Sequence, residues 1–151
     1  MGKIDVLVEK IVAYEERIRQ LYLIFAGKFA LFAEFWSELA KDAEQNAFLL
    51  GEFAGLVIDG DVALNLKHIS EDTLDESIKF VEKALIKAEN NGYDAAQALL
   101  LARAVENELL ESEIFIIFTT KIPELQQLFG VVNKNTLKHY EMLSKKCADC
   151  D

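Results

Sequence analysis

Residues 4–26 read IDVLVEKIVAYEERIRQLYLIFA, a run without glycine or proline that decides the fold of this chain. Its apolar residues recur at alternating steps of three and four, the spacing of a helix that buries one face in a bundle. The residues of that face are Ile4, Val8, Ile11, Glu15, Ile18, Tyr22 and Phe25. The pattern therefore predicts a long amphipathic helix with one carboxylate inside its apolar stripe.

Three further segments have the same period, and turn residues separate them. We expect these helices over about residues 31–58, 95–120 and 123–146. Asp59-Gly60-Asp61 ends the first of the three, and Pro123 suits the first turn of the last, where its missing N–H costs nothing. The run IFIIFTT at 114–120 could alone form a buried strand, but it continues a helical pattern and we assign it to the helix.

A shorter fifth helix is expected between the second and third long ones. Thr73-Leu-Asp-Glu76 reads as a capping box, with the threonine at the N-cap. The helix extends to about Asn90, and Asn91-Gly92 ends it because both residues tolerate the left-handed conformation. Asp94 can then cap the next long helix. The apolar face of the fifth helix, which contains no ionisable residue, consists of Leu74, Ile78, Val81 and Leu85.

The composition excludes several classes of protein. The chain has 151 residues, 26 of them acidic and 16 basic, and a net charge of −10. A single domain of this length can bury a core without disulfides, and the acidic balance argues against nucleic acid or an anionic membrane as partner. No apolar run approaches the roughly 18 residues of a spanning helix, and the N-terminus lacks a signal-peptide pattern. We therefore expect a soluble, cytoplasmic, all-α protein.

Four polar side chains interrupt the apolar stripes, one in each long helix. Glu15, Asn46, Glu108 and His139 occupy positions where the period predicts an apolar residue. If the helices pack together these groups converge in the interior, where an unpaired carboxylate would cost several kcal/mol. The pattern therefore predicts a buried hydrogen-bond network, bound water or a metal site, which Glu111, one turn after Glu108, could join.

At these positions the sequence resembles the rubrerythrin branch of the ferritin-like family. Glu15 is followed seven residues later by Tyr22, and Thr136-Leu-Lys-His139 falls where the family has Glu-x-x-His. The second helix matches through Phe35-Trp36, Leu39-Ala40 and Ala47. The resemblance implies an up-down-down-up four-helix bundle over residues 1–146, with the fifth helix in the crossover connection. It also implies a two-iron site held by carboxylates and histidines, with Tyr22 as a hydrogen-bond donor beside the ligands.

The ligand set that the resemblance implies is incomplete in this chain. Ala43 and Asn46 stand where the family has the second-helix Glu and His, and Thr136 stands where it has the fourth-helix Glu. Either Glu106 or Glu108 could be the third-helix carboxylate, and we prefer Glu108 because its stripe predicts an inward position. The candidate ligands are Glu15, Glu108, Glu111 and His139. We therefore expect no metal or a single metal ion, with iron as the candidate, in place of two irons.

Cys147-Ala-Asp-Cys150 is a lone C-x-x-C in residues 147–151, which we expect to form a tail beyond the bundle. Rubrerythrins often have a rubredoxin module with two such pairs, and a tetrahedral iron or zinc site needs four thiolates. One pair would suffice only if two chains shared the metal. The alternatives are a redox pair and a solvent-exposed tail with reducible thiols, and we prefer the exposed tail.

Three functions are compatible with these features. The first is a rubrerythrin-like protein with a degenerate iron site that acts as a binding or structural module, and this non-enzymatic reading is preferred. The second is a rubrerythrin-type oxidoreductase that reduces peroxide or oxidises ferrous iron. The third is a dimeric interaction protein that pairs through an apolar helix face such as the one with Phe29, Phe32 and Phe35. A homodimer is the expected assembly, and His68, in the irregular connection, is expected to be exposed.

Overall fold

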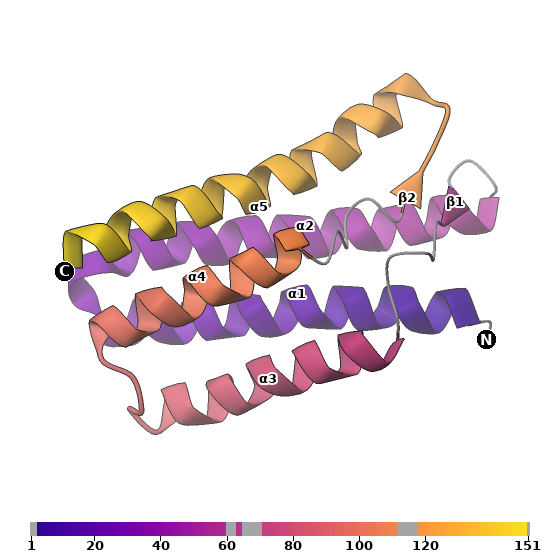
Figure 1. Ribbon diagram of the computed structural model, residues 1–151. Coiled ribbons are helices and arrows are strands. Elements are labelled where there is room, and N and C mark those ends of the chain that lie inside the picture. The colour runs from indigo at the N-terminus through magenta and orange to yellow at the C-terminus, as the bar shows by residue number, and fades with distance from the viewer. Residues whose placement is uncertain (1–2, 60–62, 65–70, 112–117, 151) are drawn as a thin grey trace.

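The computed structural model describes residues 3–59, 63–64, 71–111 and 118–150 (Figure 1). The five α-helices of this part are α1 (Lys3–Lys28), α2 (Ala33–Asp59), α3 (Glu71–Glu89), α4 (Ala95–Glu111) and α5 (Pro123–Cys150). A short 3₁₀ helix, η1 (Ala30–Phe32), joins α1 to α2. Two strands of two residues each, β1 (Ala63–Leu64) and β2 (Phe118–Thr119), pair antiparallel. The all-α class expected from the sequence is confirmed.

The helices run side by side along one long axis (Figure 1). Helix α1 packs along α2 and also along α3, while α4 packs along α5. The C-terminal end of α5 lies beside the connection between α1 and α2, where Lys146 Nζ is 4.7 Å from the centre of the Phe32 ring. The hydrophobic core takes side chains from all five helices.

The predicted stripes face this core. All described members of the α1 stripe are buried, and so are Trp36, Leu39 and Leu50 of α2. Trp36 packs against two aromatic rings of α1, with centroids 5.6 Å from Tyr22 and 4.9 Å from Phe25. Because burying each such side chain contributes about 1.5–3 kcal/mol, this contact is a major source of stability.

The phenylalanines expected to form a dimer face are largely used inside the chain. Phe35 is buried, and Phe29 and Phe32 are half-buried and pack against the core. The ammonium of Lys146 lies over the Phe32 and Phe35 rings, at 4.7 and 5.3 Å from their centres. This cation–π contact ties the end of α5 to the start of α2.

The turn between α3 and α4 is built as predicted. Asn91 has a left-handed φ of 60°, and Gly92 N donates to Lys87 O at 2.8 Å. A Cβ on Gly92 would lie 2.8 Å from the same carbonyl oxygen, which explains the glycine. Asp94 caps α4, because Gln97 N donates to Asp94 Oδ1 at 2.8 Å while Asp94 N donates to Gln97 Oε1 at 3.0 Å.

The predicted start of the fifth helix is wrong by two residues. Helix α3 begins at Glu71, so Thr73 lies inside the first turn and is not the N-cap. The acidic residues of this turn interact favourably with the positive end of the helix dipole. Lys10 of α1 adds ion pairs of 2.7 Å with both Glu71 and Asp75. These charges, which the capping-box pattern does not include, extend the helix toward its N-terminus.

The third long helix is shorter than predicted. Helix α4 ends at Glu111, and Phe118–Thr119 forms strand β2. The prediction of helix over these two residues is therefore wrong. Phenylalanine and threonine suit a pleated strand, and they pair with Leu64 and Ala63 of β1. Tertiary pairing therefore prevails over the helical period here. Residues 112–117 lie outside the described part of the chain.

The last helix is longer than predicted. Helix α5 continues past Lys146 to Cys150, and the Cys147 side chain is buried in the core, not exposed. No glycine or proline interrupts residues 131–150, and burial of Cys147 gives the extra turn a packing contact. The prediction that Cys147 lies in an exposed tail is therefore wrong. The side chain of Cys150 lies outside the described residues.

Candidate functional site

Polar side chains from all five helices are buried in the described part of the protein. They are Glu15, Asn46, Ser77, Glu106, Thr136 and His139. Glu15, Asn46 and His139 were predicted to face inward, and this is confirmed. Ser77 of α3 was not predicted, because the predicted apolar face had Ile78 at this turn, whereas the buried side of the helix includes Ser77 between Leu74 and Val81.

His139 of α5 lies between two carboxylates. Its Nε2 is 2.8 Å from Asp42 Oδ2 of α2, and its Nδ1 is 3.5 Å from Glu106 Oε1 of α4. Burial favours the neutral ring, but the interactions with Glu106 and then Asp42 outweigh it, so the pKa of His139 is raised above its usual value. The arrangement favours an imidazolium with an acceptor beside each ring nitrogen.

Glu106 supplies the buried carboxylate of α4. Its Oε1 accepts a 2.7 Å hydrogen bond from the Tyr22 hydroxyl of α1 and also faces His139 Nδ1. Burial, followed by the charge of Glu106, raises the pKa of Tyr22 well above its usual value. Tyr22 therefore remains a hydrogen-bond donor to Glu106 over the ordinary pH range.

The preference for Glu108 as the inward carboxylate is wrong. Glu108 is half-buried and accepts a hydrogen bond from Ser77 Oγ of α3. Helix α4 is buried both on its core side and toward α3, and two residues along a helix are rotated by about 200°. The helical period therefore identifies both buried sides of α4, but it does not determine which of them faces α1, α2 and α5.

Glu15 of α1 is a buried carboxyl group with a shifted pKa. Burial, and next the charge of Glu106, raise the pKa of Glu15 well above its usual range, while a hydrogen bond from Asn46 opposes them. Its Oε1 is buried and has no hydrogen-bond partner within the described residues. A neutral carboxylic acid is the form that this environment favours.

The three positions where the ferritin-like pattern is broken all face the interior. Ala43, Asn46 and Thr136 are each at most 2% exposed. Alanine has no donor atom, and Thr136 Oγ1 donates to Val132 O of its own helix at 3.1 Å. Asn46 Oδ1 accepts a long hydrogen bond, of 3.5 Å, from Asn135 Nδ2. Two irons need several anionic ligands, so the residues at these positions do not fit a two-iron centre.

The described residues contain no group of three His, Cys, Asp or Glu side chains placed to hold a metal ion. Glu111 ends α4, and its side chain, a predicted ligand, lies outside the described part of the chain. His68 also lies outside the described residues. Of the predicted Cys147–Cys150 pair, only the Cys147 side chain belongs to the described part.

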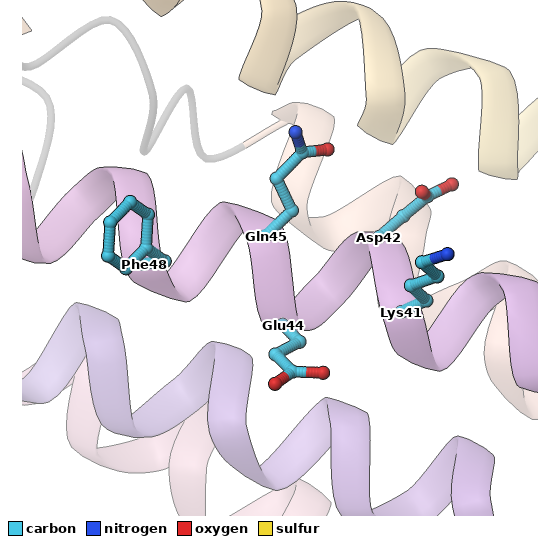
Figure 2. Close-up of a pocket in the computed structure, with 5 residues that line it drawn as sticks. All are labelled: Lys41, Asp42, Glu44, Gln45 and Phe48. Carbon is cyan, nitrogen blue, oxygen red and sulfur yellow. The ribbon is translucent and has the colours of Figure 1, made fainter.

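Asp42 is the site residue that sequence reasoning missed. Its side chain is 31% exposed, so it connects buried His139 to the surface. With Lys41, Glu44, Gln45 and Phe48 it lines a hollow of about 420 Å³ on α2 (Figure 2). Its position one turn before Asn46, and hence beside the inward face of α2, is the signal that could have identified it.

A second polar cluster lies between α1, α3 and α4. Tyr14 is buried, and burial together with the nearby charge of Glu108 raises the pKa of its hydroxyl. Ser77 Oγ of α3 donates to Glu108 Oε1 of α4. The cluster therefore joins the fifth helix to the bundle, and it is separate from the contacts of His139.

Comparisons with protein-family models, with curated proteins and with solved structures gave no match for this chain. Among the helices described, none has the length and apolar character needed to cross a membrane.

Proposed function

We propose that this protein is a ferritin-like four-helix bundle of the rubrerythrin type whose two-iron site has been reduced to a polar core. In this proposal it acts as a binding or structural module and not as an oxidoreductase. Helices α1, α2, α4 and α5 would form the bundle, and α3 would belong to the crossover between α2 and α4. The sequence resemblance in α1, α2 and α5 supports this assignment.

The observation that carries the proposal is the environment of His139. A histidine that binds a metal offers the lone pair of one nitrogen, while the other nitrogen donates to a neighbouring group. Here Nε2 faces Asp42 at 2.8 Å and Nδ1 faces Glu106 at 3.5 Å. The raised pKa of His139 favours a proton on both nitrogens. In its protonated form the ring is a cation between two carboxylates and has no lone pair for a metal.

Metal analysis tests this proposal directly. The protein is produced in iron-supplemented medium, and iron and zinc per chain are measured by elemental analysis alongside circular dichroism. We expect full helicity without stoichiometric metal, and no peroxide-reducing or ferrous-oxidising activity. About two irons per folded chain would contradict the proposal, because carboxylate and histidine ligands would then have to come from other positions.

A single metal ion is the second candidate, and one observation favours it. Glu15 Oε1 is buried without a hydrogen-bond partner, and Glu106 and His139 are the neighbouring groups of the core. Two carboxylates and one imidazole have the composition of a facial triad, and a bound iron would supply redox chemistry. The three side chains are not placed to hold a metal ion as they stand, so binding would require them to move. Binding requires the loss of a proton from His139, so it would release protons.

Calorimetric titration of chelator-treated protein with Fe²⁺, Mn²⁺ and Zn²⁺ distinguishes the two candidates. One equivalent bound, with proton release and loss of binding in Glu15→Gln, would favour the single-metal site. The matched control is Glu44→Gln, an exposed glutamate of α2. No heat of binding with any of the three ions would favour the metal-free core.

A further inference from the structure

The outward face of α2 has an apolar side chain at its centre. Phe48 is 65% exposed, and the residues around it on the same face are also exposed. These neighbours are Lys41, Glu44, Gln45, Gly51, Glu52 and Gly55. Their spacing of three, four and seven residues from Phe48 places them on one side of the helix. No described element of the chain covers Phe48.

Two glycines on this face make no close packing contact within the described part of the chain. A Cβ at Gly51 or at Gly55 would meet no atom of the described residues within 4 Å. Glycine inside a helix lowers helix stability relative to alanine, and neither position has a positive φ that would require it. Their bare backbone gives a partner room for close approach next to Phe48.

A hollow lies one turn before Phe48 on the same helix. It measures about 420 Å³ and is lined by Lys41, Asp42, Glu44, Gln45 and Phe48 itself (Figure 2). Figure 2 shows Phe48 at one end of this row of side chains and Lys41 and Asp42 at the other. The face therefore presents an aromatic projection and, beside it, a recess that could receive one.

We propose that a second copy of this chain binds antiparallel to this face, across a two-fold axis near the midpoint between Asn46 and Ala47. Lys41 and Glu52 are equally far from that midpoint along α2, so each Lys41 meets the partner's Glu52. Gln45 and Phe48 are also equally far from it, so each Phe48 enters the recess beside the partner's Gln45. The face is therefore complementary to itself in charge and in shape, which a symmetric dimer requires.

This dimer goes beyond the proposed function and affects the polar core. Asp42 lines the recess, and 31% of its side chain is exposed in the single chain. The incoming Phe48 covers this carboxylate and excludes water from its contact with His139. A contact shielded from water is electrostatically stronger, so dimerisation reinforces the pairing of α2 with α5.

Sedimentation equilibrium of the full chain over a concentration series tests the interface. We expect a dimer that Phe48→Glu weakens by roughly tenfold or more, as for a central aromatic anchor. The matched control is Ile86→Glu, because Ile86 is 62% exposed but lies on α3. This control is expected to leave the dissociation constant unchanged, and circular dichroism of each variant verifies that it is folded.

A charge exchange tests the antiparallel register. Lys41→Glu alone and Glu52→Lys alone place like charges opposite each other and weaken the dimer. The double variant restores opposite charges and recovers the affinity. A monomeric wild-type chain at all concentrations would overturn the proposal. So would equal effects of Phe48→Glu and Ile86→Glu, a double variant no tighter than the singles, or a dimer disrupted by Leu31→Glu at the bundle end and not by Phe48→Glu.

Discussion

At the scale of single residues, the core is a balance of charges around His139. The His139 ring lies between Asp42 and Glu106, which raise its pKa and favour the imidazolium, and Tyr22 donates to Glu106. Burial raises the pKa of Glu15 and favours its neutral form, so the arrangement suits one cation between two carboxylates beside a neutral acid. A buried pair of this kind adds little net stability when intact, but losing one partner is costly because the other remains buried and charged.

Removal of the imidazole should therefore destabilise the protein strongly. His139→Ala leaves Glu106 buried without its cation and opens a cavity, so we expect a loss of about 3–5 kcal/mol in the free energy of unfolding. Urea denaturation followed by circular dichroism measures it. Lys138→Ala, at the exposed neighbouring position, should change that free energy by at most about 0.5 kcal/mol. Similar losses in both variants would mean that the His139 contacts contribute nothing specific.

Stability should fall as pH rises, because the pKa values of His139 and Glu15 are raised and both groups therefore bind protons more tightly in the folded chain. The stabilisation from His139 is complete below its unfolded pKa of about 6.5 and is lost as pH rises through the raised folded value. The raised pKa of Glu15 acts in the same direction above about pH 4.5.

We therefore expect the urea midpoint, measured with a chelator present, to decrease from about pH 5 to pH 8. Glu15→Gln should flatten this dependence, because the amide does not titrate. Glu44→Gln, which changes an exposed glutamate of the same type, should leave it intact. A midpoint that increases over this interval in the wild-type chain would refute the assignment of a neutral Glu15 and a charged His139.

At the scale of elements, α2 and α4 each have more than one functional face. Helix α4 directs Glu106 into the core and Glu108 toward Ser77 of α3. Helix α2 directs Asn46 inward, Asp42 toward α5 and Phe48 outward. A single stripe therefore describes α1, which is buried on one broad side, better than it describes these two helices.

The glycines of α2 should respond differently from the glycine that follows α3. In the Phe48→Glu background, which removes the dimer anchor, Gly51→Ala should raise the free energy of unfolding by about 0.5–1 kcal/mol, since nothing lies within 4 Å. Gly92→Ala should lower it, because the new Cβ would lie 2.8 Å from Lys87 O. Thermal denaturation gives both values. A destabilising Gly51→Ala would imply a constraint on α2 that its surroundings do not account for.

At the scale of the whole molecule, four of the five helices (α1, α2, α4 and α5) contribute distant positions to the buried interior. Ala43 and Asn46 come from α2, Thr136 and His139 from α5, Glu15 from α1 and Glu106 from α4, and all are buried. In sequence these residues are spread over most of the chain. These residues therefore all belong to the buried interior, where Ala43 lacks a ligand atom and Asn46 and Thr136 are uncharged.

Restoring the missing ligands should therefore create metal binding. The triple variant Ala43→Glu, Asn46→His and Thr136→Glu gives each of these inward positions a charged or imidazole ligand. We expect uptake of about two metal ions per chain and a thermal midpoint that rises with Fe²⁺ or Zn²⁺. Elemental analysis and calorimetry measure both effects.

The control for this variant replaces Asn46→His with Gln45→His, which moves the imidazole to an exposed position on the same helix. It should bind metal more weakly and show a smaller thermal shift. If the triple variant folds yet binds no more metal than the control, positions 43, 46 and 136 do not share a ligand site.

The inward positions of Glu15, Asn46 and His139 could be predicted because each interrupts a stripe whose other members are apolar. The pairing of Asp42 and Glu106 with His139 could not be predicted, because the three residues lie on different helices and are distant in sequence. The strand at Phe118–Thr119 was missed for a similar reason, since it depends on pairing with β1. Burial of Cys147 depends equally on a core that α5 meets only in the folded chain.

The sequence by itself determined the helical class, the inward face of α1 and the turn at Asn91-Gly92, because these follow from local periodicity and backbone preference. Tertiary structure alone decided that Glu106 and not Glu108 faces His139, and that Asp42 completes the contact. The physical reason is that a helical period defines which residues share a side, whereas the partner of a buried charge is set by how neighbouring helices are rotated and packed against it.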